Sequence, residues 1–217
     1  MRIAVIGAGN VGGTLGRRWA TLGHDVVFGV PDPARSAAVK GGATVDEALP
    51  SSASVTTVAE AVRGADVVLL ATPWAAVDAA LRAAGAMDGA VLIDATNPVG
   101  AGVRIDPAIG GSSGGEHVQS LAPRARVVKA FNTTGWENMR DPRYATGDAT
   151  MFVAGDDPGA KAVVRVLAAA LGFDPVDVGG LSRARELEHL AILWISLAAG
   201  AGVPAMGRNF AFRLMHR

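Results

Sequence analysis

The sequence contains no cysteine among its 217 residues. This absence excludes disulfide bonds, thiolate catalysis, cysteine-ligated zinc and iron–sulfur clusters. An excess of charge of one sign is also missing, because 20 basic residues balance 20 acidic ones. This balance argues against the broad basic surface typical of proteins that bind nucleic acids or anionic membranes. We therefore expect neither of these partners.

Long hydrophobic runs and targeting signals are scarce as well. The chain passes from Met1 and Arg2 directly into a short apolar segment, without the layout of a secretory signal, so we expect a cytoplasmic protein. Residues 190–207 form an uncharged stretch of 18 residues, close to the lower limit for a membrane span. Because Gly200 and Pro204 interrupt this stretch, we expect a helix buried in the core or in a homodimer interface instead.

The sequence does contain a regular alternation of two patterns. Short apolar runs without polar interruption are typical of parallel strands that are covered on both faces, and segments with helical periodicity separate them. This alternation predicts an α/β protein with a doubly wound, mostly parallel sheet. The main domain is expected at residues 1–178, and a helical extension packed on it, as one compact unit, at 179–217. The expected strands are Arg2–Ile6, Asp25–Val30, Ala53–Val58, Asp66–Ala71, Ala90–Asp94, Arg126–Phe131, Met151–Ala154 and Asp174–Val178, the expected helices are Val11–Leu22, 33–40, 74–85, 116–121, 157–171 and one after Gly180, and Pro98–Gly115 is expected to be a loop.

A glycine cluster follows the first expected strand and opens the first helix. It reads G-A-G-N-V-G-G and fits the pattern G-x-G-x-x-G. In this pattern Gly7 permits the tight turn, Gly9 leaves room for a pyrophosphate, and Gly12 allows the helix to pack closely on the strand. The first N–H groups of the helix, which include those of Asn10 and Val11, and the helix dipole favour that anion. We therefore predict a Rossmann domain that binds a dinucleotide.

The end of the second expected strand bears on which dinucleotide binds. Asp32 lies near the distance at which an acidic residue accepts hydrogen bonds from the ribose of NAD, although it follows the strand in a proline turn. Arg35 is the nearest cation for the 2′-phosphate of NADP. The alternative is that both are ordinary turn residues in contact with solvent. We expect NADP(H) to be preferred by a modest margin, with NAD(H) as the alternative.

Polar residues follow three further expected strands at the same edge of the sheet. Because the carboxyl ends of parallel strands meet there, these residues are expected to contact the nicotinamide half of the cofactor and its hydride acceptor. For Trp74 a packing role is the alternative, and Asn97 with Pro98 is also a common turn pair. The expected cofactor contacts are Thr72, Pro73 and Trp74, and the residues expected to position the nicotinamide or the acceptor are Asn97, Pro98, Asn132 and Thr133.

No two histidines have the spacing of metal ligands, so no metal site is predicted. We identify no catalytic triad either. Direct hydride transfer does not need one, because the cofactor carries the chemistry while the protein positions two rings.

The order of these motifs resembles that of the NADPH-dependent coenzyme F420 reductases (F420H2:NADP oxidoreductases), whose Rossmann domain is also found in six-transmembrane ferric reductases. The resemblance implies a hydride moving between NADP(H) and a deazaflavin or flavin. It departs at Val30, Pro31 and Asp32, where family members carry Ser or Arg for the 2′-phosphate. The matching segments are Gly7–Gly13, Leu22–His24, Ala71–Trp74, Asp94–Pro98, Val127–Thr133, Val153–Asp157, Leu171–Phe173 and Gly180–Glu188.

Three functions remain open from the sequence. The leading hypothesis is an NAD(P)-dependent oxidoreductase that acts on a small-molecule acceptor, coenzyme F420 or a flavin. A second is a reductase of a small imine-like substrate, and a third is a non-catalytic NAD(P)-binding sensor or partner protein.

Overall fold

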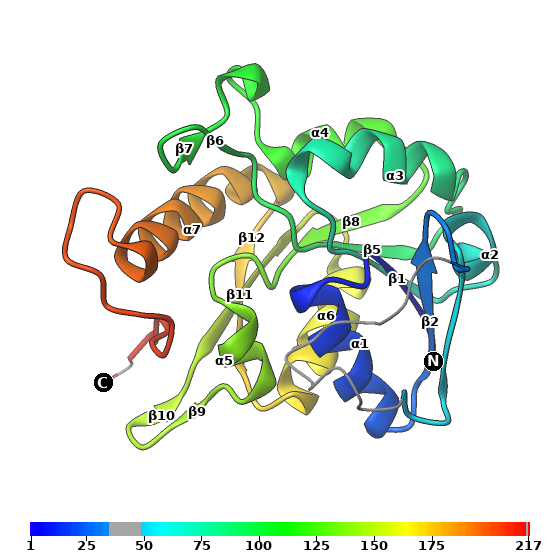
Figure 1. Ribbon diagram of the computed structural model, residues 1–217, viewed down its shortest axis with the longest axis horizontal. Coiled ribbons are helices and arrows are strands. Elements are labelled where there is room, and N and C mark those ends of the chain that lie inside the picture. The colour runs from blue at the N-terminus through cyan, green and yellow to red at the C-terminus, as the bar shows by residue number, and fades with distance from the viewer. Residues whose placement is uncertain (35–48, 216) are drawn as a thin grey trace.

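The computed structural model describes residues 1–34, 49–215 and 217. Its centre is an eight-stranded sheet with the strand order β12-β11-β8-β5-β4-β1-β2-β3 (Figure 1). Neighbouring strands run parallel from β3 through β8, whereas β11 joins β8 antiparallel and β12 lies parallel to β11. The predicted doubly wound, mostly parallel sheet is therefore confirmed. Its strands are β1 (Arg2–Ile6), β2 (Asp25–Val30), β3 (Ala53–Thr57), β4 (Val67–Leu70), β5 (Val91–Asp94), β8 (Arg126–Lys129), β11 (Thr150–Gly155) and β12 (Asp174–Gly179).

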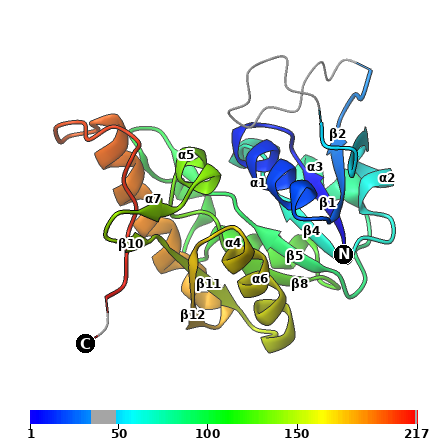
Figure 2. The same cartoon turned by 90° about the horizontal axis from the view of Figure 1, so that it is seen from below.

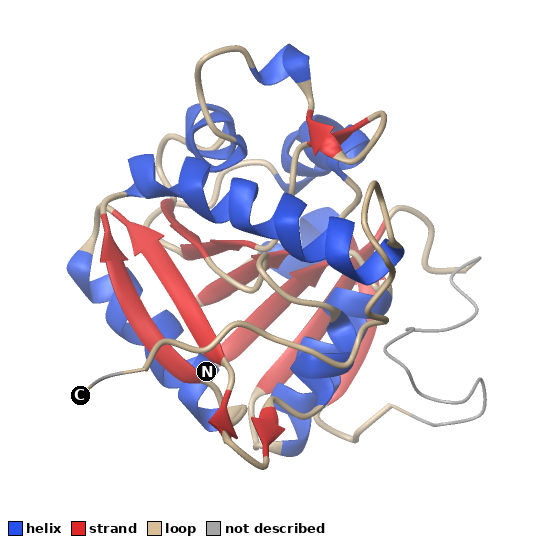
Figure 3. Ribbon diagram, turned by 90° about the vertical axis from the view of Figure 1, so that its left-hand side faces the viewer, coloured by secondary structure: helices blue, strands red, loops and turns tan. Residues whose placement is uncertain are grey.

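Helices cover both faces of this sheet (Figure 3). In β1, Ile3 and Val5 belong to the core under α1 and α6, whereas Ala4 and Ile6 belong to the core under α2, α3 and α4. All four side chains are at most 1% exposed, which explains the uninterrupted apolar runs of the sequence. The helices are α1 (Asn10–Thr21), α2 (Val58–Val62), α3 (Val77–Ala84), α4 (Gly114–Leu121), α5 (Trp136–Arg140), α6 (Pro158–Ala170) and α7 (Ala184–Ala199).

The structure differs from the predicted elements mainly between the strands. Val58 begins α2 instead of ending a strand, because the Thr57 side chain accepts a hydrogen bond from the Glu60 N–H and caps a helix there. α5 has no counterpart among the predicted elements. The predicted helix at 33–40 falls mostly within residues 35–48, which lie outside the described residues.

The segment predicted as the loop Pro98–Gly115 is partly ordered into regular structure. It contains a small hairpin of β6 (Val99–Gly100) and β7 (Arg104–Ile105), which projects above the sheet in Figure 1. It also contains the first two residues of α4, which begins before the predicted residue 116. The reason is a capping box, in which the Ser113 side chain and the Glu116 side chain each bond the other's backbone N–H.

The C-terminal extension consists of one helix and an irregular tail. α7 ends where Gly200 adopts the left-handed conformation with φ of +76°. The tail then runs back past α7 and the hairpin of β9 (Arg143–Tyr144) and β10 (Gly147–Asp148) (Figure 2). The Phe210 carbonyl accepts hydrogen bonds from Trp194 Nε1 (2.9 Å) and Asn138 Nδ2 (2.7 Å), so the tail is attached to both α7 and α5.

Two predictions about this extension are not decided by the fold. The predicted boundary after residue 178 falls one residue before the end of β12, and the division into two parts stays a prediction. Leu193 on α7 is 50% exposed, and the homodimer predicted through this helix also stays a prediction. Within the described part of the chain, no helix is long and apolar enough to cross a membrane.

Candidate functional site

The turn between β1 and α1 combines two tightly packed glycines with an open one. Gly7 has φ of +102°, and a Cβ there would lie 2.6 Å from the Ala71 carbonyl oxygen. A Cβ at Gly12 would overlap the Gly7 carbonyl oxygen, whereas a Cβ at Gly9 would meet nothing within 4 Å. The open space beside Gly9 is where the G-x-G-x-x-G pattern predicts the approach of a pyrophosphate.

The first turn of α1 is not capped by the protein itself. Gly9 is the N-cap residue and supplies no side-chain hydrogen bond, and the first turn contains no acidic residue. The Gly13 N–H donates to the Gly9 carbonyl (2.8 Å), while the preceding N–H groups have no partner within a helix. The N–H groups of Asn10, Val11 and Gly12, together with the helix dipole, therefore suit an anionic ligand.

The residues predicted to discriminate NADP from NAD follow β2. Asp32 lies in an exposed turn, and its carboxylate accepts a hydrogen bond from the Ala34 N–H (3.1 Å). Arg35 lies outside the described residues. The structure thus locates Asp32 at the expected strand end, and the role of Arg35 stays a prediction.

The loop after β4 lies directly beside the glycine turn. A Cβ at Gly7 would lie 3.3 Å from Thr72 Cγ2. Thr72 Oγ1 is buried and finds no hydrogen-bond partner in the described part of the chain. The Trp74 ring has its centroid 5.5 Å from that of His117 on α4. Thr72 is thus available to a ligand in the turn, while Trp74 makes a packing contact on the side of α4.

A cavity of about 640 Å³ adjoins Trp74. It lies between the loop after β4, the helices α3 and α4, and the segment that follows β5. His117 Nε2 lies 2.8 Å from Asp78 Oδ1 within its lining, and Asp106 and Glu116 also line it. Its size suits a small organic ring system.

Asn97 and Asn132 meet where β5 and β8 end. Asn132 Nδ2 donates to Asn97 Oδ1 (3.0 Å), and Asn97 Nδ2 donates to the Asn132 backbone carbonyl (2.9 Å). Asn132 is only 4% exposed, yet its Oδ1 has no hydrogen-bond partner among the described residues. A buried amide oxygen without a partner costs about 1–3 kcal/mol, so this atom is a candidate acceptor for a ligand. Pro98 and Thr133 are buried beside the two amides.

A strained residue precedes Asn132. Phe131 has φ of +61°, a conformation that bulky side chains rarely adopt. Its ring makes edge contacts with Trp19 (centroids 5.8 Å apart) and Phe173 (6.1 Å), and its N–H donates to Met151 Sδ (3.0 Å). β8 therefore ends at Lys129 and not at Phe131 as predicted, and these contacts fix Phe131 in a turn. This turn brings Asn132 to Asn97.

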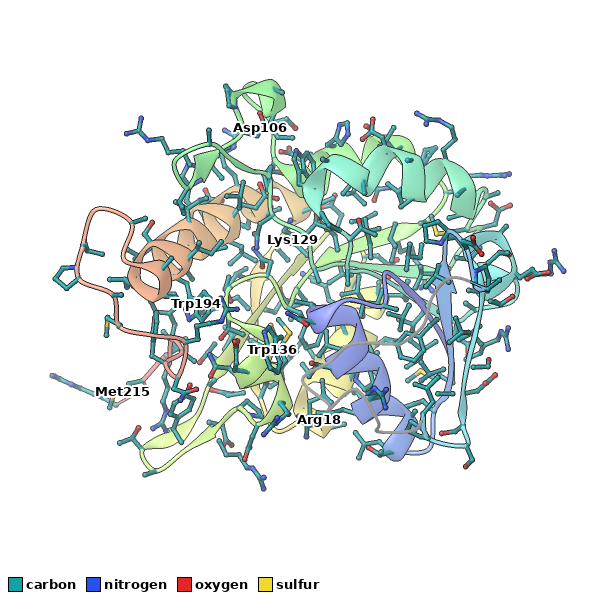
Figure 4. The ribbon with its side chains drawn as sticks, in the orientation of Figure 1. Arg18, Asp106, Lys129, Trp136, Trp194 and Met215 are labelled. Atoms are coloured by element: carbon teal, nitrogen blue, oxygen red, sulfur yellow. The ribbon has the colours of Figure 1, made fainter. Side chains whose placement is uncertain are left out.

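A buried ion cluster lies beneath the two amides. Lys129 is fully buried on β8, at the centre of Figure 4. Its Nζ donates to Asp94 Oδ2 (2.9 Å), to the Thr96 carbonyl (2.8 Å) and to Glu188 Oε1 (2.7 Å). Glu188 comes from α7, whereas Asp94 is the last residue of β5 and Thr96 follows that strand. All three donors of the ammonium group are therefore used.

The charge state of this cluster follows from its surroundings. Burial alone would lower the pKa of Lys129, but the adjacent carboxylates of Asp94 and Glu188 raise that pKa above its ordinary value. The ammonium group therefore stays charged at neutral pH. Glu188 also accepts hydrogen bonds from the N–H groups of Gly114 (3.0 Å) and Gly115 (3.1 Å) at the start of α4. The positive end of that helix thus offsets the second carboxylate.

Sequence reasoning missed this cluster, although two signals for it exist. Lys129 interrupts the apolar strand V-V-K-A-F, and lysine is almost never fully buried unless it is paired. Glu188 lies among residues with helical apolar periodicity, where a buried carboxylate also requires a partner. Neither signal identifies the partner. In the described residues, no three His, Asp or Glu side chains form a group that could hold a metal ion.

Replacing Gly9 with valine is expected to abolish dinucleotide binding while the protein stays folded. The added side chain has room in the turn and would occupy the approach of the pyrophosphate. In thermal unfolding, Gly9→Val should melt near the wild-type temperature without the shift that NADPH causes in the wild type. Gly12→Val is the control, because its Cβ would overlap the Gly7 carbonyl and should destabilise the fold itself. A normal NADPH shift in Gly9→Val would contradict this site.

Replacing Lys129 with methionine is expected to lower the free energy of unfolding at neutral pH by about 3–5 kcal/mol, because two buried carboxylates lose their cation. In the variant, the folded state should bind protons at these carboxyls more readily than the unfolded state. The difference in the free energy of unfolding between wild type and variant should therefore shrink as the pH falls toward about 5. Urea unfolding of both proteins across this range measures the effect. A deficit that grows on acidification would show that the carboxylates are not the cause.

Comparisons with known proteins identify the family. Residues 2–98 match the family model described as NADP oxidoreductase, coenzyme F420-dependent. A solved structure from Arthrobacter sp. FB24, assigned as an F420-dependent NADP reductase, is 35% identical with a TM-score of 0.83, and the match covers 100% of both chains. Metalloreductase STEAP3 of Rattus norvegicus is 31% identical over 192 residues, which are 88% of this chain and 36% of that protein.

Other matches cover a smaller share of the other protein or have a lower sequence identity. The chain spans little more than a third of the length of the curated metalloreductases that it matches. The reductive aminase from Aspergillus terreus, solved with NADPH and ethyl levulinate, has a TM-score of 0.66 at 19% identity, and the match covers 93% of this chain and 62% of that one. This last likeness shows the fold alone. The family resemblance predicted from the motifs is confirmed, and the chain belongs to the coenzyme F420-dependent family of NADP oxidoreductases.

Proposed function

We propose that the protein transfers a hydride between NADP(H) and a deazaflavin such as coenzyme F420, or a flavin. The observation that carries this proposal is the buried, unpartnered Oδ1 of Asn132, at the same sheet edge as the open turn at Gly9. A dinucleotide whose pyrophosphate lies at the start of α1 extends across this edge. Its carboxamide carries the N–H donors that Asn132 Oδ1 lacks.

The chain's own groups bind and orient the two rings. When bound, the reduced nicotinamide supplies the hydride. The first N–H groups of α1 hold the pyrophosphate, and Thr72 Oγ1, buried beside Gly7, donates to an oxygen of the cofactor. The Asn97–Asn132 pair fixes the carboxamide, and with it the plane of the ring. Pro98 and Thr133 are buried beside the pair and keep water from it. Orienting two reactants in this way supplies much of the rate of such a reaction.

The cavity beside Trp74 is our assignment for the acceptor ring. It adjoins the loop that follows β4 and the segment that follows β5, and Pro73 of that loop and Val99 of β6 line it. The carboxylates of Asp78, Asp106 and Glu116 also line it. Because these carboxylates repel an anion, a phosphate-bearing tail of the acceptor would lie outside the cavity, toward solvent.

The test of this function is a deuterium-transfer assay. NADPH deuterated at C4 of the nicotinamide is mixed with coenzyme F420, and in parallel reactions with FMN, FAD, ferric chelates and cyclic imines. With coenzyme F420 we expect deuterium at C5 of the deazaflavin without exchange with solvent. Turnover of cyclic imines alone would favour the imine-reductase hypothesis. Nucleotide binding without turnover of any acceptor would favour the sensor hypothesis.

The preference for NADP(H) is a prediction about two residues after β2. Arg35→Ala should weaken NADPH binding about tenfold, because a charge-assisted pair with the 2′-phosphate is lost, and should leave NADH binding nearly unchanged. Asp32→Ala should leave NADPH binding unchanged or strengthen it, since it removes a carboxylate near that phosphate. Calorimetric dissociation constants for both nucleotides on the three proteins measure this. Tighter binding of NADH by the wild type, with Arg35→Ala affecting both nucleotides alike, would reverse the assignment.

A further inference from the structure

We propose that Glu188 on α7 is a positioning residue for the nicotinamide end of the site, acting through Lys129 and Thr96 on the Asn97–Asn132 pair. The inference rests on the proposed function, because it takes this pair as the holder of the cofactor's carboxamide. Glu188 itself is expected to touch neither cofactor nor acceptor. Its effect reaches the amide pair through a chain of direct hydrogen bonds that ends at Thr96, the residue before Asn97.

The first step joins α7 to α4. The Glu188 side chain is 2% exposed, and its two oxygens accept hydrogen bonds from the Gly114 and Gly115 N–H groups. These residues must be small. A Cβ at Gly114 would lie 2.9 Å from Glu188 Oε1, and a Cβ at Gly115 would lie 2.8 Å from the Ala184 Cβ at the start of α7. The carboxylate thus fixes the distance between the two helices.

The second step joins this carboxylate to the turn after β5. Lys129 bridges Glu188 to Asp94 and to the Thr96 carbonyl. Asp94 Oδ1 in turn accepts hydrogen bonds from the Thr96 N–H (2.9 Å) and the Thr96 hydroxyl (2.7 Å). Thr96 is therefore held at its N–H, its carbonyl and its side chain. Because Thr96 directly precedes Asn97, the cluster sets the direction of the chain at Asn97.

A second contact from α7 supports the other amide. Trp194 is 3% exposed, and a Cβ at Gly135 would lie 2.5 Å from Trp194 Cη2. Trp194 therefore packs against the loop that begins with Asn132. One helix thus supports both of the loops that carry the amide pair.

Stability alone is a weak reason for such a cluster. Buried ion pairs often contribute little net stability compared with apolar residues of similar size. α7 already has buried apolar anchors in Leu187, Ala191 and Trp194. A fully satisfied polar network does, however, specify one geometry. Because this network lies directly beneath the amide pair, we infer that it serves to fix the geometry of that pair.

The experiment compares two ligands that differ only in the nicotinamide end. NADPH tests the whole site, and 2′-phospho-ADP-ribose tests the pyrophosphate and adenosine end. In Glu188→Gln we expect the dissociation constant of NADPH to rise about tenfold, the value of one lost hydrogen bond to a ligand. The dissociation constant of 2′-phospho-ADP-ribose should change less than about twofold, since its contacts lie at α1 and β2. Asn97→Ala should show the same selective loss, and the double variant should show no further loss.

Two further variants complete the test. Glu186→Gln is the matched control on the same helix, because Glu186 is exposed and pairs only with Arg183 at 3.4 Å among the described residues. It should change neither dissociation constant. Gly115→Ala separates α7 from α4 without altering charge, and should reproduce the selective loss even if Glu188→Gln does not fold. Equal weakening of both ligands, or no weakening of NADPH, in a folded variant would overturn the positioning role. Failure of the wild type to bind either ligand would instead overturn the proposed function.

Discussion

The ammonium group of Lys129 is the constraint on which the rest of the site depends. Its three hydrogen bonds connect the ends of β5 and β8 to α7, and through Glu188 to α4. No apolar contact could reproduce this arrangement, because hydrophobic burial has no direction, whereas each hydrogen bond fixes an atom at a defined distance and angle. The elements joined here lie far apart in the sequence. The cluster therefore joins the C-terminal helix to the sheet edge that carries the two amides.

The two halves of the site are built on different principles. The end that we propose for the pyrophosphate relies on backbone, since the groups offered there are N–H groups in the turn formed by Gly7, Gly9 and Gly12. The end that we propose for the nicotinamide relies on side chains, namely two amides that follow different strands and meet only because β5 and β8 are neighbours. Backbone sites need a particular local fold, whereas side-chain sites need the whole sheet to be in register. The second half is accordingly the one that needs support from distant residues.

This difference also explains which features could be predicted from the sequence. The glycine turn is local, and the apolar strands follow from burial on both faces, so both are visible in short stretches of sequence. Asn97 and Asn132 could be picked out as polar ends of apolar strands, but their mutual hydrogen bonds depend on strand order. The pairing of Lys129 with Glu188 spans 59 residues, and nothing local to either residue names its partner. The start of α4 at Gly114 could have been predicted, because Ser113 and Glu116 have the spacing of a capping box.

The far edge of the sheet has a consequence for self-association. β12 is an edge strand, and exposed edges are places where strands of separate molecules can pair and aggregate. Here Pro175 supplies no N–H group, Asp174 is exposed, and the register shifts between Val153 and Ala154 on the neighbouring strand. Proline, charge and an irregular ladder each discourage a further strand from adding. At β12, copies of this chain are thus hindered from adding strands to one another's sheets and growing into a fibril.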